Sequence, residues 1–234
     1  MIFSRRTGEG REEGESRDLS GQLVTLLDPS NVASEAYRTL RTNLLYAFVD
    51  DPPRVILLTS PGRREGKSIT CANLGVVLAQ VGKSVLIVDC DLRKPAVHDV
   101  FGLGNAQGLI TVLVKERRLQ HTWDEPMEGL KVLTAGPTPP NPAEVLSTQR
   151  FAEFMQQARE EFDYVLLDGP PLGPVADSAV LSVHADGSLL VIDSQNTRKV
   201  AVRRSVRDLE AVGGDVIGVV MNKAQGFGIN DYYG

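Results

Sequence analysis

The residues best suited to chemistry are Gly66, Lys67 and Ser68, which follow an apolar run at residues 55–59 and precede a helical pattern. A strand, a loop and a helix N-terminus in this order are typical of a phosphate-binding loop, in which backbone N–H groups surround phosphate oxygens. In such a loop Lys67 would reach the phosphates and Ser68 would be a ligand of Mg²⁺. Pro61 departs from the usual pattern, because it stands where the motif has its first glycine. The spacing predicts a site for a nucleoside triphosphate.

Three carboxylates at the ends of apolar runs would complete this site. Asp89 and Asp91 end one such run, and their i, i+2 spacing in an extended chain directs both side chains to the same side. Asp168 ends another run, which begins at Tyr164. Because ligands of parallel sheets bind at the carboxyl ends of the strands, we expect the three carboxylates near the phosphates, where they would hold Mg²⁺. The alternative interpretation is that they are solvated aspartates at strand ends.

The segments that must position these residues alternate in type along the chain. Short apolar runs with few polar interruptions predict strands that are buried on both faces. The expected strands are residues 55–59, 84–89, 131–134, 164–168, 188–193 and 216–221. The expected helices are residues 30–49, 68–81, 109–115, 143–160 and 199–212. This alternation predicts an α/β fold with a doubly wound, mostly parallel sheet and helices on both faces.

Composition limits the kinds of protein that this chain could be. The 234 residues are 42% hydrophobic and 24% charged, which is typical of a soluble globular domain. A net charge of −5 argues against a nucleic-acid partner, because phosphate backbones require clustered basic residues. No apolar run reaches the ~18 residues that cross a bilayer, the first residues lack the apolar core of a secretory signal, and two cysteines are too few for a disulfide framework. We therefore expect a cytoplasmic protein.

The two ends of the chain differ from its middle. Residues 1–29 are rich in polar residues of mixed charge and predict a disordered tail. Residues 224–234 are glycine-rich and carry the adjacent tyrosines Tyr232 and Tyr233, either as a flexible functional tail or as an ordinary aromatic terminus. Between them, residues 30–223 are expected to form the catalytic domain.

With these motifs in place, residues 31–234 resemble the bacterial tyrosine kinases, P-loop autokinases that are related to the MinD, ParA and Mrp ATPases. After the phosphate-binding loop, the segment from Asp89 to Arg93 resembles the family's Walker A′ motif, and Asp168 with the following Gly-Pro-Pro resembles its Walker B motif. MinD and ParA carry a signature lysine five residues before the loop lysine. Here that position is Gly62, which favours the kinases.

Two further matches concern assembly and the acceptor. Glu35, Arg38 and Arg41 match the family's E-x2-R-x2-R motif, which mediates packing of subunits into a ring. Helical geometry places Glu35 and Arg38 opposite the apolar stripe and Arg41 beside it, free to meet another chain, although a solvated face with pairs inside the helix is the alternative. Tyr232 and Tyr233 resemble the family's C-terminal tyrosine cluster, which neighbouring subunits phosphorylate, although two tyrosines are fewer than is usual.

The resemblance also implies a role for each residue of the site. The implied catalytic residues are Lys67, Asp89, Asp91 and Arg93. The implied metal ligands are Ser68, Asp89, Asp91 and Asp168. The implied ATP-binding residues are Gly62, Arg63, Arg64, Glu65, Gly66, Lys67, Ser68, Ile69 and Asn222. Asp89 would also orient the tyrosyl hydroxyl rather than take its proton early, since tyrosine has a pKa near 10 and aspartate near 3.9. Arg93 would stabilise its own loop or the neighbouring subunit.

The expected function is that of an ATP- and Mg²⁺-dependent protein-tyrosine autokinase, which phosphorylates C-terminal tyrosines of neighbouring subunits and regulates capsule and exopolysaccharide export. The family's kinases need a membrane activator, a polysaccharide co-polymerase. Here we expect a separate protein that holds a homo-oligomeric ring at the inner face of the membrane. One alternative is a MinD- or ParA-like ATPase switch without kinase activity. Another is a weakly catalytic scaffold, which the atypical loop residues Pro61, Arg63 and Arg64 suggest.

Overall fold

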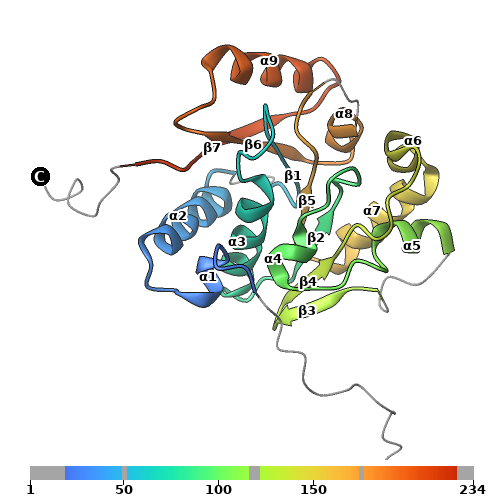
Figure 1. Cartoon of the computed structure of the whole chain (residues 1–234), viewed down its shortest axis with the longest axis horizontal. Coiled ribbons are helices and arrows are strands. Elements are labelled where there is room, and N and C mark those ends of the chain that lie inside the picture. Colours follow the sequence, from blue (N-terminus) through green and yellow to red (C-terminus); the bar gives the residue numbers. More distant parts are fainter. Residues whose placement is uncertain (1–18, 49–51, 116–121, 174–176, 226–234) are drawn as a thin grey trace, which may run out of the picture.

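The computed structural model describes residues 19–48, 52–115, 122–173 and 177–225 (Figure 1). Its strands form one sheet in the order β3-β4-β2-β5-β1-β6-β7, in which only the β3–β4 pair is antiparallel. The strands are β1 Val55–Thr59, β2 Val85–Asp89, β3 Asp124–Met127, β4 Leu130–Leu133, β5 Tyr164–Asp168, β6 Gly187–Asp193 and β7 Val216–Asn222. The mostly parallel α/β sheet and all six expected strands are confirmed.

Helices cover both faces of this sheet (Figure 1). They are α1 Val24–Leu27, α2 Val32–Tyr46, α3 Lys67–Ala79, α4 Val97–Phe101, α5 Leu109–Lys115, α6 Pro142–Leu146, α7 Gln149–Glu161, α8 Asp177–Ser182 and α9 Lys199–Glu210. Successive strand residues point to opposite faces, so Ile56 and Leu58 of β1 join the core under α3, while Leu57 joins the core under α7. Two apolar layers therefore fix the position of β1 and of the loop that follows it.

The structure differs from the prediction in one expected helix, in strand β3, and in the short helices α1, α4 and α8, which were not predicted. The helix predicted at residues 143–160 is divided into α6 and α7, because the Thr148 hydroxyl accepts a hydrogen bond from the N–H of Phe151 (3.3 Å) and caps a new helix. Strand β3 was not predicted. Its four residues, Asp-Glu-Pro-Met, carry no apolar alternation, and it pairs with β4 only at the edge of the sheet.

The prediction of disorder over residues 1–29 is wrong for residues 19–29. Leu23 is fully buried and belongs to the same apolar core as the buried side chains of α3. Thr25 donates from its N–H (3.0 Å) and from its hydroxyl (2.8 Å) to the side-chain oxygen of Asn73, which is fully buried in α3. Asn73 in turn donates to the carbonyl of Gln22 (3.0 Å). A short apolar stretch and one buried polar cluster thus order a segment whose average composition is polar.

Several predictions concern residues that the structure does not describe. Residues 1–18 of the expected N-terminal tail and residues 226–234 of the expected C-terminal tail, with Tyr232 and Tyr233, lie outside the described residues. Within the described ranges, no helix has the length and apolar character needed to cross a bilayer.

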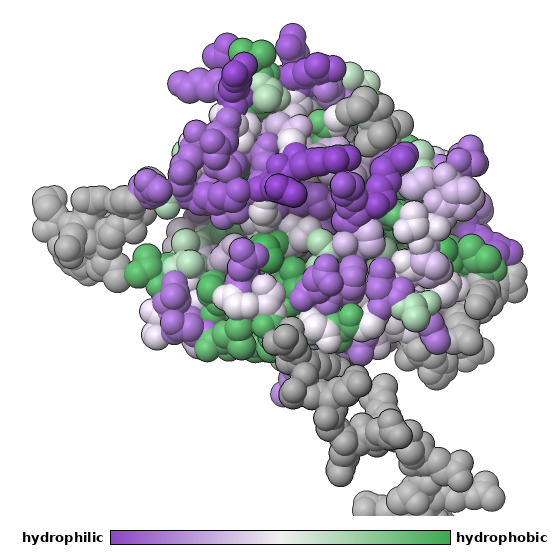
Figure 2. Space-filling view, viewed as in Figure 1, coloured by the Kyte–Doolittle hydropathy of each residue, from purple (hydrophilic) through white to green (hydrophobic). Residues whose placement is uncertain are grey.

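The space-filling view shows hydrophilic side chains gathered over α9, which buries only Ser205 and Leu209 (Figure 2).

Candidate active site

The loop between β1 and α3 has the predicted strand–loop–helix form. It ends at Gly66, whose φ of 94° places it in the left-handed region directly before the first residue of α3. A Cβ at Gly66 would collide with the side-chain amide of Asn222, so the position requires glycine for space as well as for conformation. The N-terminus of the thirteen-residue helix α3 opens onto the main cavity of the described structure, where its N–H groups favour an anion.

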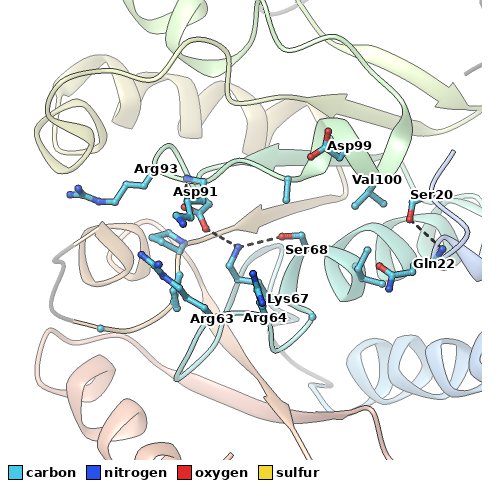
Figure 3. Close-up of a pocket in the computed structure, with 17 residues that line it drawn as sticks. Ser20, Gln22, Arg63, Arg64, Lys67, Ser68, Asp91, Arg93, Asp99 and Val100 are labelled. Carbon is cyan, nitrogen blue, oxygen red and sulfur yellow. Dashed lines mark hydrogen bonds and ion pairs between the residues drawn. The ribbon is translucent and has the colours of Figure 1, made fainter. Parts of the chain in front are cut away.

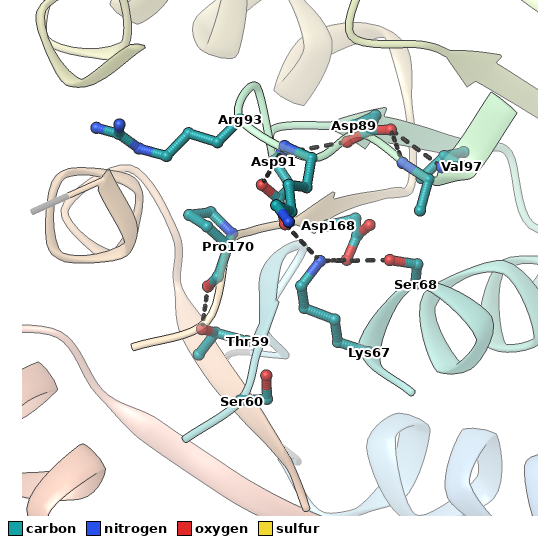
Figure 4. A network of polar contacts seen from close by, with 12 residues as sticks. Thr59, Ser60, Lys67, Ser68, Asp89, Asp91, Arg93, Val97, Asp168 and Pro170 are labelled. Atoms are coloured by element: carbon teal, nitrogen blue, oxygen red, sulfur yellow. Dashed lines mark hydrogen bonds and ion pairs between the residues drawn. The ribbon is translucent and has the colours of Figure 1, made fainter. Parts of the chain in front are cut away.

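Lys67 pairs with one carboxylate at the end of β5 and with another in the turn after β2. Its Nζ lies 3.1 Å from Asp91 Oδ2, 3.2 Å from Asp168 Oδ1 and 3.3 Å from the Ser68 hydroxyl (Figures 3 and 4). Burial alone would lower the pKa of Lys67, but the nearby charges of Asp168 and Asp91 outweigh this effect and raise it. Lys67 therefore stays protonated, and the structure brings the phosphate-binding motif and two of the three predicted carboxylates together.

Asp89 is placed differently from its predicted role. Its Oδ2 accepts hydrogen bonds from the N–H groups of Ala96 and Val97 (both 3.0 Å), and its Oδ1 accepts one from the N–H of Asp91 (3.2 Å) (Figure 4). The side chain is fully buried, and Asp91, not Asp89, lines the cavity. In this structure Asp89 thus holds the turn that carries Asp91.

The sheet register explains the charge state of the buried carboxyls. Asp89 and Asp168 are directly opposite each other in the β2–β5 pair. Burial and the Asp168 charge raise the pKa of Asp89 to about 8, and burial raises the pKa of Asp168 despite the charge of Lys67. Two like charges side by side in the core therefore favour the uptake of a proton in the absence of a further cation.

Asp168 has a carboxylate oxygen that is suited to bind a cation. It is fully buried, and its Oδ2 receives no hydrogen bond from the residues that the structure describes. A buried oxygen of this kind favours a ligand, and a carboxylate oxygen beside the Ser68 hydroxyl suits the hard, oxygen-seeking Mg²⁺. Over the described ranges no three His, Cys, Asp or Glu side chains form a ready cluster for a metal. The residues therefore fit an ion that keeps most of its coordination for water and phosphate.

The cavity over these residues has a volume of about 660 Å³. Six of the predicted ATP-binding residues line it: Arg63, Arg64, Gly66, Lys67, Ser68 and Ile69. Arg93, which lies across the cavity from Arg63 and Arg64 in Figure 3, and Lys94 also line it, so five cationic side chains face one cavity, as a polyanionic ligand requires. Sequence reasoning did not assign nine of the lining residues to the site, which are Ser20, Gln22, Lys94, Ala96, Asp99, Val100, Pro170, Pro171 and Gly173. The signal for the first two was the apolar stretch at residues 23–27, within the segment expected to be disordered.

Gly62, Glu65 and Asn222 do not line this cavity. Glu65 Oε2 accepts hydrogen bonds from the Asp193 N–H (2.9 Å) and the Thr197 hydroxyl (2.7 Å). The Asn222 amide donates to the carbonyl of Glu65 (2.9 Å). In this structure, Glu65 and Asn222 therefore hold the outer side of the loop, and their contact with ATP stays a prediction.

Arg93 reaches from the turn after β2 to the first residue of α8. Its Nε lies 2.7 Å from Asp177 Oδ2 and its Nη2 lies 3.2 Å from Asp177 Oδ1. Asp177 is almost fully buried, while the Arg93 side chain is 44% exposed. This two-pronged pair agrees with the expectation that Arg93 stabilises its own loop.

The E-x2-R-x2-R residues form contacts within the chain. Arg38 Nη1 lies 2.6 Å from Glu35 Oε2, which is the pairing inside the helix that was the alternative interpretation. Arg41 donates from one guanidinium nitrogen to the carbonyl of Val77 in α3 (3.1 Å), and its contact with another chain stays a prediction. Glu35 remains 65% exposed.

Comparison with known proteins places this site in a family. Residues 54–229 match the ParA family model, described as NUBPL iron-transfer P-loop NTPase. The chain is 43% identical to tyrosine-protein kinase YwqD of Bacillus subtilis over 86% of this chain and 85% of that protein. It is 36% identical to the putative tyrosine-protein kinase CapB of Staphylococcus aureus over 83% and 86%. Tyrosine-protein kinase wzc of Salmonella typhimurium is 34% identical over 94% of this chain but only 31% of its own length.

Solved structures agree with these relatives. The chimerical protein CapA2B2 superposes with a TM-score of 0.83 at 35% identity, covering 87% of this chain and 90% of that one. The kinase domain of the Escherichia coli tyrosine kinase ETK gives 0.81 at 30% identity over 92% and 82%. The cell division ATPase MinD of Pyrococcus furiosus, at 24% identity and 0.63 over 74% and 73%, shares the fold.

The fold and the loop site are those of a P-loop NTPase of the ParA and MinD type. Within that class, the chain belongs to the bacterial tyrosine-protein kinases, which confirms the predicted resemblance and enzyme class.

Proposed function

We propose that this chain transfers the γ-phosphoryl group of ATP, with Mg²⁺, to tyrosine side chains, and that Tyr232 and Tyr233 of neighbouring copies are acceptors. The convergence of Lys67, Asp91 and Asp168 at the N-terminus of α3 is the observation that carries the proposal. Transfer of a phosphoryl group depends mainly on positioning and on neutralising charge, and this cavity combines cations, helix N–H groups and carboxylates.

The residues divide the work as follows. Lys67, Arg63 and Arg64 bind the phosphate oxygens, together with the first N–H groups of α3. Ser68 and Asp168 hold Mg²⁺, which when bound neutralises phosphate charge. Asp91, the carboxylate that lines the cavity, orients the acceptor hydroxyl, and Asp89 keeps Asp91 in place through the hydrogen bond from the Asp91 N–H. This assignment moves the orientation of the acceptor hydroxyl from Asp89, where the sequence placed it, to Asp91.

The remaining parts of the proposal rest on the family. We infer that copies of this chain assemble into a ring through Glu35, Arg38 and Arg41, and that residues 30–223, with the ordered segment 19–29 packed against them, act as the catalytic domain. A separate membrane activator would hold the ring at the inner face of the membrane, where it regulates capsule and exopolysaccharide biosynthesis. Support comes from the relatives named putative tyrosine-protein kinase CapB and, in Ralstonia solanacearum, putative tyrosine-protein kinase EpsB, and from the exposed Glu35.

A MinD-like ATPase switch is the second candidate, because MinD shares the fold. Gly62 argues against it, since MinD and ParA use a lysine at this position. One experiment separates the two: intact mass of the purified chain after incubation with ATP and Mg²⁺, with and without the cytoplasmic segment of a candidate activator, followed by peptide mapping. Phosphate on Tyr232 or Tyr233 that is absent from Lys67→Met supports the autokinase. ADP release without added mass supports the switch, and neither product supports the scaffold.

A further inference from the structure

The outer side of the phosphate-binding loop is held by residues at the carboxyl ends of β6 and β7 and directly after them. The Nζ of Lys223 donates to the carbonyl of Arg64 (2.7 Å) and to Asp193 Oδ2 (2.8 Å). The Asn222 amide donates to the carbonyl of Glu65 (2.9 Å). Two consecutive residues at the end of β7 therefore bind two consecutive carbonyls of the loop.

These contacts fix the direction of the loop N–H groups. In a trans peptide the C=O of one residue and the N–H of the next point in opposite directions. Because Lys223 and Asn222 hold the carbonyls of Arg64 and Glu65 on the outer side, the N–H groups of Glu65 and Gly66 face the other way. Gly66 lines the main cavity, so that direction is toward the phosphate site.

The backbone conformation of the phosphate-binding loop explains why it needs stabilising hydrogen bonds from another part of the chain. In the described ranges, Arg64 (φ 61°) and Lys223 (φ 56°) are the non-glycine residues in the left-handed region, which side chains disfavour. The two residues are joined by the hydrogen bond that Lys223 Nζ donates to the Arg64 carbonyl. The carbonyl of Lys223 itself accepts a hydrogen bond from the Gln195 side chain (2.7 Å). Residues in unfavourable backbone conformations are concentrated at functional sites, so the hydrogen-bonded pair of Arg64 and Lys223 beside the cavity indicates a functional role for both.

Lys223 is anchored on its second side by a carboxylate that stays ionised. Hydrogen bonds from Lys223 and Asn196 lower the pKa of Asp193 to about 2. The Asp193 N–H donates to Glu65 Oε2, so the end of β6 binds the loop as well. The ends of β6 and β7 thus form one polar brace, made of Asp193, Thr197, Asn222 and Lys223.

We propose that Lys223 is a positioning residue of the nucleotide site, which holds the phosphate-binding loop in its binding conformation by bonding the Arg64 carbonyl and the Asp193 carboxylate at once. This inference rests on nucleotide binding in the proposed function and not on the identity of the phosphate acceptor. Lys223 acts through the loop and does not line the main cavity.

The test compares Lys223→Met with Lys223→Arg in the full chain. Calorimetric titration with ADP and Mg²⁺ gives the dissociation constant, and steady-state rates give KM for ATP and kcat. Loss of two charge-assisted hydrogen bonds in Lys223→Met should weaken ADP binding about tenfold and raise KM by a similar factor, with kcat at saturating ATP within about twofold. Lys223→Arg should restore most of the affinity. Lys131→Met, which removes a lysine paired with Glu125 at the β3–β4 edge, is the matched control and should change neither constant.

Unchanged ADP affinity in Lys223→Met would overturn the inference, as would an equal loss in Lys131→Met or a fall in kcat alone. If Lys223→Met does not fold, Asp193→Asn, which removes the anchoring charge at nearly constant shape, should weaken ADP binding several-fold, and unchanged binding there would be equally decisive. A parent chain that binds ADP but forms no phosphotyrosine would refute the proposed kinase function and leave this inference standing.

Discussion

The ammonium of Lys67 lies 3.2 Å from Asp168 Oδ1, and this buried pair joins the start of α3 to the end of β5. Across the sheet, Asp89 stands opposite Asp168. One lysine therefore balances part of a charge that two neighbouring strands bury together. The remaining negative charge destabilises the empty site, because a buried carboxylate without a counter-charge is unfavourable. Binding of a further cation would remove this cost.

This balance predicts the pH dependence of stability. Folding raises the pKa of Asp89 to about 8 and also raises that of Asp168, so the folded protein binds more protons than the unfolded chain between the unfolded value near 4 and about pH 8. The free energy of unfolding should therefore fall as pH rises through this window. Asp168→Asn should flatten the fall by up to about 1 kcal/mol per pH unit, while abolishing phosphoryl transfer.

Urea unfolding at pH 5, 6.5 and 8 with EDTA measures this effect. Asp163→Asn is the matched control, because hydrogen bonds from Ser84 lower the pKa of Asp163, and its titration lies below the window. Its slope should equal that of the parent chain. If the Asp168→Asn profile ran parallel to both, the two buried carboxyls would not be coupled to folding.

The pair between Arg93 and Asp177 predicts a measurable coupling energy. Arg93→Gln leaves the buried Asp177 without its two-pronged partner and should lower the free energy of unfolding, by an amount that the exposure of Arg93 reduces. Arg93→Lys should recover little, since an ammonium cannot match both oxygens. A double-mutant cycle with Asp177→Asn measures the coupling by urea unfolding, and a coupling energy near zero would contradict the assignment.

The N-terminal segment should contribute to stability. Thr25→Val removes the hydroxyl that bonds the fully buried Asn73 and should lower the free energy of unfolding by about 1 kcal/mol. Thr42→Val is the matched control, because the Thr42 hydroxyl bonds only the carbonyl of Arg38 on an exposed helix face, and its effect should stay below about 0.5 kcal/mol. Equal effects of the two variants would mean that residues 19–27 are not tightly packed in solution.

The ring assignment predicts the oligomeric state. Alanine at Glu35, Arg38 and Arg41 should leave a monomer by light scattering, whereas the parent chain should form the larger species. Because Arg41 also bonds the carbonyl of Val77, its single replacement serves as a control for local stability, checked by thermal unfolding. An unchanged oligomer in the triple variant would exclude this surface from assembly.

Local patterns determined most of the fold and the chemistry of the site. Buried parallel strands are short apolar runs, so each expected strand could be identified from its own residues. The phosphate-binding motif could be identified in the same way, because it lies within residues 60–68, directly after such a strand. The edge strand β3 and the break between α6 and α7 escaped because their signals are a weak polar pairing and one capping hydroxyl.

Only the tertiary structure decided which side chain performs which task. Asp89 and Asp91 are both aspartates near the end of the same strand, so their sequence positions do not tell their roles apart. The pairing of β2 with β5 and the turn that leads to α4 bury Asp89 and place Asp91 at the cavity. Likewise, Lys223 lies 159 residues from Arg64 along the chain, and only the parallel order β1-β6-β7 brings it to the loop. Such contacts depend on which strands become neighbours, and the free energy of that choice comes from the whole core rather than from any local sequence.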